Sequence, residues 1–197
     1  MFARIQKTLS LQTGFPITQA VVDGSQKGEV YAFENNYFVI HKSGFCSFIP
    51  KKDCTEQLMV LLQQKIIPQY IHIYDADEKL IEAFQNKNDL FNIKLRKRVQ
   101  LEYLNTSSLQ PLHIENYYSK PLSEANFNFL SSFNLDLDKK FWNGIADCVR
   151  NAMGVVIFGN DLPVCICYAA AVAENKAEVD VFTSEEHRGK GLARLAL

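Results

Sequence analysis

The sequence predicts an α/β protein with an α+β region at its N-terminal end. Three short segments rich in aromatic and β-branched residues lie between residues 30 and 49, and three more lie between residues 153 and 183. Such segments with polar turns between them are typical of antiparallel strands. Intervening segments have apolar residues at helical spacing, and a glycine-rich turn follows the last strand. Sheets flanked by helices are the expected architecture.

Composition excludes several classes of protein. The chain has 197 residues, 47% of them hydrophobic, and a formal net charge of −1. The length suits one large domain or two small ones, and the charge gives no global signal for nucleic acid or an anionic membrane. The longest apolar run, Val164–Val172, is too short to cross a bilayer, and the N-terminus lacks the apolar core of a signal peptide. We therefore expect a soluble cytoplasmic protein without nucleic-acid or membrane partners.

The cysteines predict neither disulfides nor a metal site. There are five, an odd number, and no signal peptide precedes them. Cys165 and Cys167 alternate along one strand and should face the same way, but no second pair or nearby histidine accompanies them. Buried free thiols are the expected state.

The sequence pattern of residues 1–105 predicts an N-terminal α+β region. A short helix is expected near Phe2–Leu11, and two capping boxes, at Asp53 and at Asp75, should open later helices. The remaining elements are three strands, a helix ended by Pro68, a strand, a helix and a last strand: Val30–Phe33, Tyr37–His41, Phe45–Ile49, Gln57–Ile67, Tyr70–Tyr74, Asp77–Gln85 and Phe91–Tyr103.

The last of these strands contains a basic run, Lys94–Arg98, that could form a nucleic-acid patch. Apolar and charged residues alternate through Phe91–Tyr103, so the charges are explained as the solvated face of a strand. Nucleic-acid binding stays an alternative, which steep salt dependence would reveal.

Residues 106–197 predict a second domain, after the polar, turn-rich segment Asn105–Pro111. Gly144 should weaken its second helix only slightly. Its elements are a strand, two helices, a hairpin and a third antiparallel strand: Tyr117–Lys120, Ser123–Phe133, a helix from Asp136 or Asp138 to Ala152, Met153–Phe158, Pro163–Ala173 and Ala177–Thr183.

The turn after the third strand carries the chemistry. Gly189 and Gly191 permit unusual backbone angles and close approach of a ligand. Their N–H groups, with the positive end of the helix that begins there, predict a diphosphate site. Arg188 and Lys190 add positive charge, and the small Ala193 leaves room for a phosphate. The spacings of the Walker loop and the dinucleotide fingerprint are absent.

This segment resembles the GNAT superfamily of N-acetyltransferases. The signature Arg/Gln-x-x-Gly-x-Gly/Ala matches Arg188–Ala193, and Val181–Thr183 matches the strand end that precedes it. The order of elements from about Tyr117 is also similar, which implies the family's mixed sheet flanked by helices. The N-terminal region looks similar to the extra region of two-part GNAT proteins.

The resemblance implies acetyl-coenzyme A as cosubstrate, no metal, and direct acetyl transfer to an unidentified primary amine on a small molecule or peptide. The strand end would hold the pantetheine arm and the turn the pyrophosphate, which assigns cofactor binding to Val181, Phe182, Thr183, Arg188, Gly189, Lys190, Gly191, Leu192 and Ala193. A general base takes the amine proton. Glu178 and Asp180, which share a strand face, are the candidates, and an exposed structural carboxylate is the alternative for each. His187 contacts phosphate or is a surface histidine.

The sequence departs from the family at its end. GNAT proteins continue through a helix, a fifth strand and another helix that frequently supplies a tyrosine acid, whereas this sequence ends about one turn into the first helix. We therefore expect an incomplete GNAT domain that alone binds the cofactor weakly and turns over poorly. A non-catalytic coenzyme A-binding or regulatory module is the alternative function, and a homodimer is left open.

Overall fold

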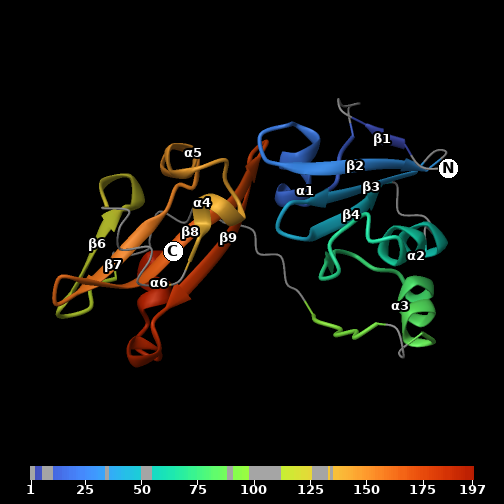
Figure 1. Ribbon diagram of the computed structural model, residues 1–197. Coiled ribbons are helices and arrows are strands. Elements are labelled where there is room, and N and C mark those ends of the chain that lie inside the picture. The colour runs from blue at the N-terminus through green and yellow to red at the C-terminus, as the bar shows by residue number, and fades with distance from the viewer. Residues whose placement is uncertain are drawn as a thin grey trace.

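The computed structural model describes residues 3–5, 11–33, 36–49, 55–87, 91–97, 112–125, 133 and 135–197. Within these residues the strands form two sheets, one in each half of the chain (Figure 1). The N-terminal sheet has the order β1-β2-β3-β4-β5, and the C-terminal sheet has the order β6-β7-β8-β9. The predicted combination of sheets and flanking helices is confirmed.

The N-terminal sheet contains the three predicted neighbouring strands with one further strand on either side. Its members are β1 (Ala3–Ile5), β2 (Gly28–Phe33), β3 (Asn36–His41), β4 (Phe45–Ile49) and β5 (His72–Ile73). All pairs are antiparallel except β4 with β5. The helix predicted near Phe2–Leu11 is wrong for Ala3–Ile5, because these residues pair with the free edge of β2. Residues 6–10 lie outside the described residues.

Three helices belong to this half: α1 (Pro16–Val22), α2 (Thr55–Gln63) and α3 (Glu78–Gln85). The helix α1 was not predicted, because every residue from Ile17 to Val22 is buried and the helix has no exposed polar face. The helix α2 ends before the predicted Ile67, and Lys65 has a left-handed φ of 54°.

Asp77 caps the N-terminus of α3, and its side chain accepts a hydrogen bond of 2.8 Å from the Leu80 amide. The predicted cap at Asp75 is wrong, since Asp75 itself has a left-handed φ of 60° and lies before the cap. The other predicted cap, Asp53, lies outside the described residues.

The predicted strand Phe91–Tyr103 is wrong for residues 91–97, which have no regular secondary structure. Phe91 and Ile93 pack against the N-terminal core, but Leu95 is 62% exposed, so the apolar face does not continue. Lys94 is exposed in this segment and not on the face of a sheet. Residues 98–103 lie outside the described residues.

The C-terminal sheet follows the predicted strand order closely. Its strands are β6 (Tyr117–Pro121), β7 (Val155–Gly159), β8 (Leu162–Ala173) and β9 (Lys176–Thr183), and every pair is antiparallel. The register of β8 against β9 shifts between Ala169 and Ala171, so Ala170 is the extra residue of a β-bulge. The sheet therefore bends where it approaches the N-terminal half.

The helices of this half are shorter than predicted. They are η1 (Leu122–Glu124), α4 (Leu137–Lys140), α5 (Ile145–Asn151), η3 (Glu185–His187) and α6 (Leu192–Ala196). One long helix up to Ala152 is wrong, because Gly144 has a φ of 130° and separates α4 from α5. The helix predicted over Ser123–Phe133 is wrong at Ala125, which is extended after η1. Residues 126–132 lie outside the described residues.

The two faces of the C-terminal sheet carry separate cores. Phe141 and Trp142, which follow α4, pack with Tyr168 on one face. Leu192 and Ala196 of α6 pack with Ile157 on the other. The α6 segment and the turn before it therefore lie on the opposite side of β9 from α4 and α5.

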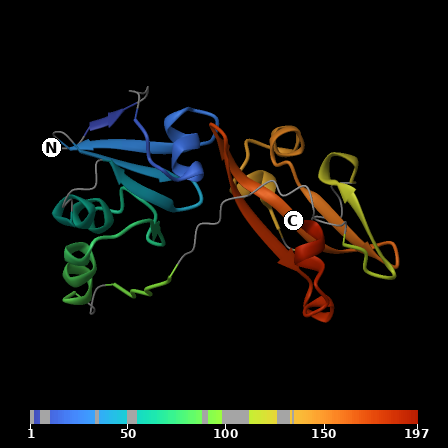
Figure 2. The same cartoon turned by 180° about the vertical axis from the view of Figure 1, so that it is seen from behind.

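The two halves meet where α1 contacts β8 and β9. The tip of the β8–β9 hairpin reaches α1 in both Figure 1 and Figure 2. Ile17 and Ala20 of α1 belong to the same buried cluster as Ala170 and Ala171 of β8. The proposed division between residues 105 and 106 stays a prediction, because residues 98–111 lie outside the described residues.

Candidate functional site

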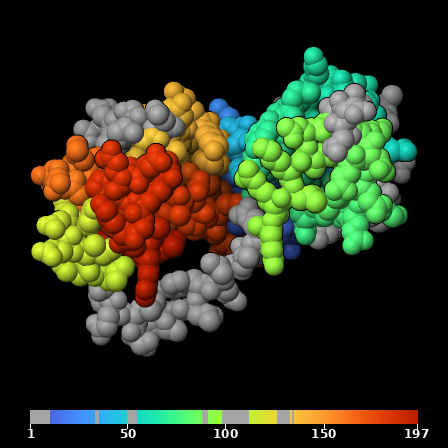
Figure 3. All heavy atoms as spheres, turned by 90° about the horizontal axis from the view of Figure 1, so that it is seen from below, coloured from blue at the N-terminus to red at the C-terminus, as the bar shows by residue number. Residues whose placement is uncertain are grey.

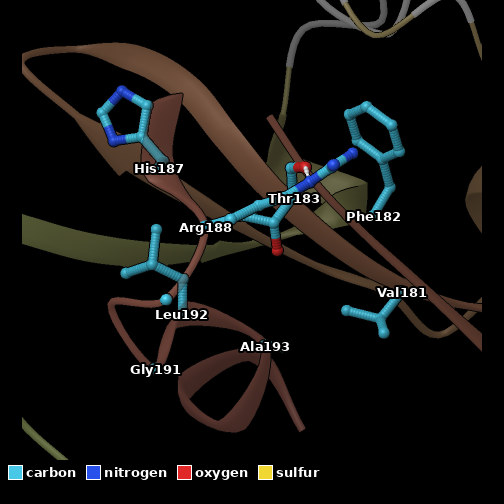
Figure 4. A pocket seen from close by; sticks show the side chains of 9 residues that line it. Val181, Phe182, Thr183, His187, Arg188, Gly191, Leu192 and Ala193 are labelled. Carbon is cyan, nitrogen blue, oxygen red and sulfur yellow. Dashed lines mark hydrogen bonds between the residues drawn. The ribbon is translucent and has the colours of Figure 1, made fainter. Parts of the chain in front are cut away.

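A pocket of about 360 Å³ lies between the end of β9 and the turn that leads to α6 (Figure 4). Figure 4 shows Val181 and Phe182 projecting from opposite sides of β9, with Arg188 beside Thr183. The residues that line the pocket are Val181, Phe182, Thr183, His187, Arg188, Gly189, Gly191, Leu192 and Ala193. The structure thus brings the predicted cofactor residues together around one pocket, apart from Lys190, which does not line it.

The turn has the backbone geometry of an anion-binding loop. Gly189 and Gly191 have φ values of 76° and 79°, in the left-handed region that favours glycine. Among the described residues, the amides from Gly189 to Ala193 donate no hydrogen bond to any protein group. Successive unpaired N–H groups in such a turn form a concave site for anionic oxygens.

The turn is fixed at its start by bonds to the sheet. The Ser184 amide donates to the Val164 carbonyl at 2.9 Å, which anchors the segment just after β9. The guanidinium of the exposed Arg188 donates through Nε to the Thr183 carbonyl at 3.2 Å. The remaining guanidinium N–H groups of Arg188 can still bind an anion. The strand end and the turn therefore form one structural unit.

A second set of contacts joins the turn to β6. Tyr117 Oη lies 3.0 Å from His187 Nδ1, and Lys190 Nζ lies 3.3 Å from the same hydroxyl. In Figure 3 the C-terminal segment, in red, lies on the surface beside the segment containing β6, in yellow-green. Sequence analysis assigned Tyr117 only to a strand, because no local pattern links it to a turn seventy residues later.

The strand β9 is the edge of its sheet within the described residues. The backbone N–H and C=O groups on the outer side of an edge strand can pair with an extended ligand. Val181 and Thr183 pair on their inner side with Cys167 and Cys165 of β8. An extended chain could lie along β9 and end at the unpaired amides of the turn.

The two candidate base residues face the same side of β9 as α4 and α5. Glu178 is 8% exposed and accepts a 2.6 Å hydrogen bond from Tyr74 Oη, which belongs to the N-terminal half. Asp180 is exposed, and its Oδ2 accepts a 2.8 Å bond from Tyr168 Oη. Burial and the nearby Asp180 raise the pKa of Tyr168, so its hydroxyl remains protonated and donates. Sequence analysis had identified neither tyrosine as a partner.

The described cysteines are poor nucleophiles. All are buried and free. Burial raises the pKa of Cys148 to about 12 and that of Cys167 to about 11, and it also raises the pKa of Cys165. Thiols with such pKa values carry little thiolate near neutral pH. The described residues also contain no group of three His, Cys, Asp or Glu side chains placed to hold a metal ion.

Comparison with known proteins decides the family. Residues 8–197 match the model of the family described as GNAT acetyltransferase. The chain belongs to this family. The match includes the N-terminal half, so the GNAT assignment extends well beyond the pocket and the strands that precede it.

Individual relatives agree with this GNAT assignment. A segment of 74 residues is 28% identical to "Uncharacterized N-acetyltransferase YdfB" of Bacillus subtilis (strain 168). The segment covers 38% of this chain and only 28% of that protein.

Among the described residues no helix is long and apolar enough to pass through a membrane.

Two solved GNAT structures share the fold. The GCN5-related N-acetyltransferase-like protein from Streptococcus suis 89/1591 superposes with a TM-score of 0.61 at 13% identity, covering 91% of this chain and 74% of that one. The GCN5-related N-acetyltransferase from Kribbella flavida gives a TM-score of 0.51 at 12% identity, covering 88% and 72%. At these identities the likeness shows the fold alone.

Proposed function

We propose that this GNAT family member transfers the acetyl group of acetyl-coenzyme A to a primary amine on a small molecule or peptide. The observation that carries the proposal is the turn after β9, where two left-handed glycines leave the amides of Gly189–Ala193 unpaired at a pocket. A diphosphate supplies several anionic oxygens that match a row of N–H donors. Family membership supports the same donor.

The chain would bind the donor in two parts. The amides of Gly189–Ala193 would accept the diphosphate, with Arg188 adding positive charge at the pocket. The pantetheine arm, which is extended and carries amide groups, would pair with the outer backbone edge of Val181–Thr183. The acetyl thioester would then lie beyond Val181, toward the earlier residues of β9.

Transfer would proceed without an acyl-enzyme. The amine nitrogen attacks the thioester carbonyl carbon, a C–N bond forms, and the C–S bond breaks to release coenzyme A thiolate. A carboxylate on β9, Glu178 or Asp180, accepts the amine proton directly or through water. Cysteine nucleophiles are unnecessary, in agreement with the raised pKa values of the buried Cys148 and Cys167 thiols. These thiols in the free state also suit a reducing cytoplasm.

The decisive experiment measures coenzyme A thiol release and amide product together. The full-length protein is incubated with acetyl-coenzyme A and a panel of alkyl amines, polyamines, aminoglycosides and peptides, and products are identified by mass spectrometry. Stoichiometric thiol and acetyl-amide with at least one amine is the expected result. Tight coenzyme A binding with no product from any amine would contradict the proposal and favour a non-catalytic binding module.

Variants of the candidate bases refine this test. Glu178→Gln and Asp180→Asn each remove a proton acceptor while keeping the side-chain shape. Loss of the true base should lower kcat about a hundredfold or more, whereas the affinity for coenzyme A should hold. Wild-type kcat in both variants would remove β9 carboxylates from the mechanism.

A further inference from the structure

Two tyrosine–carboxylate pairs lie along one side of β9, and they differ in origin. The Asp180 partner, Tyr168, comes from the adjacent strand β8 directly across the register. The Glu178 partner, Tyr74, follows β5 in the N-terminal sheet, 104 residues earlier in the chain. A contact between the two halves of the chain thus ends on a candidate catalytic carboxylate.

Two neighbouring aromatic rings pack against the ring of Tyr74 and so fix the position of its hydroxyl. The Phe15 ring lies 4.6 Å from the Tyr74 ring between centroids, and the Phe45 ring lies 5.5 Å away on the N-terminal sheet. Tyr74 is itself buried, so its hydroxyl has few alternative positions. A donor fixed in this way orients the Glu178 carboxylate at a lower entropy cost than a mobile side chain would.

Side-chain hydrogen bonds also fix the backbone of β8 opposite Glu178. Gln26, also from the N-terminal half, donates through Nε2 to the carbonyl of the bulge residue Ala170 at 2.9 Å. Trp142 donates through Nε1 to the preceding carbonyl, that of Ala169, at 3.2 Å. Glu178 pairs with Ala171, the next residue after the bulge. Bulges re-aim side chains near functional sites, and here two buried donors fix the bulge.

The two candidate bases differ in burial and in position along β9. Asp180 is exposed, and it accepts bonds from the Tyr168 hydroxyl at 2.8 Å and from the Val181 amide at 2.9 Å. Glu178 is buried, where a proton acceptor is more effective because water is excluded. A pantetheine arm along Val181–Thr183 directs its thioester toward the earlier part of the strand, where Glu178 lies.

We infer that Tyr74 is a positioning residue that holds Glu178 as the general base, so that the N-terminal half completes the acetyl-transfer centre. The inference rests on the proposed function. Tyr74 orients the carboxylate through its bond to Oε1, and the same carboxylate would accept the amine proton directly or through water. Tyr74 does not itself touch the reacting atoms.

A double-mutant cycle tests the inference in the full-length protein, with an amine that the wild type acetylates. The variants are Tyr74→Phe, Glu178→Gln and the pair together, and each is assayed for kcat, for KM toward acetyl-coenzyme A, and for its thermal midpoint. Tyr74→Phe should lower kcat about tenfold to a hundredfold while KM for acetyl-coenzyme A stays unchanged. In the Glu178→Gln background it should have no further effect on kcat.

The matched control is Tyr168→Phe, which removes the corresponding bond to Asp180 and should lower kcat less than Tyr74→Phe does. Wild-type kcat in Tyr74→Phe, or an equal loss with and without Glu178, would overturn the inference while leaving the proposed function intact. Absence of acetylation by the wild type would overturn both. If Tyr74→Phe folds poorly, Glu178→Asp withdraws the carboxylate by one methylene. A reduced kcat then supports positioning, and a wild-type kcat opposes it.

Discussion

The hydroxyl of Tyr117 lies 3.0 Å from Nδ1 of His187, and this contact joins β6 to the edge of the pocket. Lys190 reaches the same hydroxyl from the turn at 3.3 Å. One tyrosine thus holds two residues that flank Gly189, so the shape of the turn depends on a strand far away in the sequence. A prepared turn binds its ligand with less loss of conformational entropy than a mobile one.

Tyr117→Phe should therefore weaken coenzyme A binding. Loss of a hydrogen bond of this kind costs about 0.5–1.5 kcal/mol, so the Kd measured by isothermal titration should rise about twofold to tenfold. Tyr118→Phe is the matched control, because the Tyr118 hydroxyl bonds to Asp161 at 2.9 Å in the exposed β7–β8 turn. Equal Kd values for the two variants would show that Tyr117 does not prepare the turn.

Gly189→Ala tests the left-handed backbone of the turn. Gly189 and Gly24 both have a φ of 76°, and a Cβ at either position would meet nothing within 4 Å. Alanine at each should cost about 1–2 kcal/mol of folding stability from backbone strain alone. Only Gly189→Ala should also raise the Kd for coenzyme A, by about tenfold, because relief of the strain moves the amides. An unchanged Kd would mean that this conformation is not the one that binds.

Alkylation tests the state of the thiols. Burial raises the pKa of Cys148 to about 12 and that of Cys167 to about 11, and Cys46 and Cys165 shift in the same direction. With Cys54 replaced by serine, the folded protein should react slowly with iodoacetamide at neutral pH and quickly in guanidinium. Rapid modification of one folded thiol, located by peptide mass spectrometry and accompanied by loss of transfer, would support a cysteine mechanism instead.

His41 should make stability fall at mildly acidic pH. Burial, followed by the charge of Lys42, lowers the pKa of His41 from 6.5 to about 4. The unfolded chain takes up this proton below pH 6.5 but the folded chain only near pH 4, so the contribution is complete above pH 6.5 and is lost as the pH falls through this window. The loss between pH 6.5 and pH 5 is about 2 kcal/mol.

Urea denaturation at pH 7 and pH 5 measures this effect. His41→Gln should reduce the difference in unfolding free energy between the two pH values, whereas His113→Gln, at an exposed position, should not. An identical pH difference in the wild type and His41→Gln would assign the acid sensitivity to other groups. The His41 ring stacks on Phe141 with 6.2 Å between ring centroids, so protonation of His41 should weaken the contact between the two halves of the chain.

Most strands could be predicted from the sequence, because alternating apolar residues and the turn residues between strands lie close together along the chain. The β7–β8 turn, for example, places Asn160 and Asp161 at left-handed φ values of 50° and 62°, which these residue types tolerate. The helix α1 could not be found in this way, since it is buried on all sides. Phe91–Lys97 shows the opposite failure, because alternation without a partner strand produced no strand.

The candidate site likewise contains residues that the sequence could predict and residues that it could not. The turn was predicted because its glycines and basic residues lie next to each other in the sequence and match a family motif. Tyr74 and Tyr117 were missed, since each reaches its partner across the fold and leaves no periodic signal near its own position. Sequence analysis therefore located the carboxylates of β9 but not the groups that orient them.

The most direct test of diphosphate binding by the turn follows the backbone amides of residues 189–193 by ¹⁵N NMR during titration with coenzyme A. Pantetheine, which lacks the diphosphate, serves as the control ligand. Coenzyme A should shift the signals of these five amides strongly and in a saturable manner, whereas pantetheine should shift only the signals of Val181–Thr183. Saturable coenzyme A binding that leaves the amides of residues 189–193 unmoved would contradict the claim that this turn holds the diphosphate.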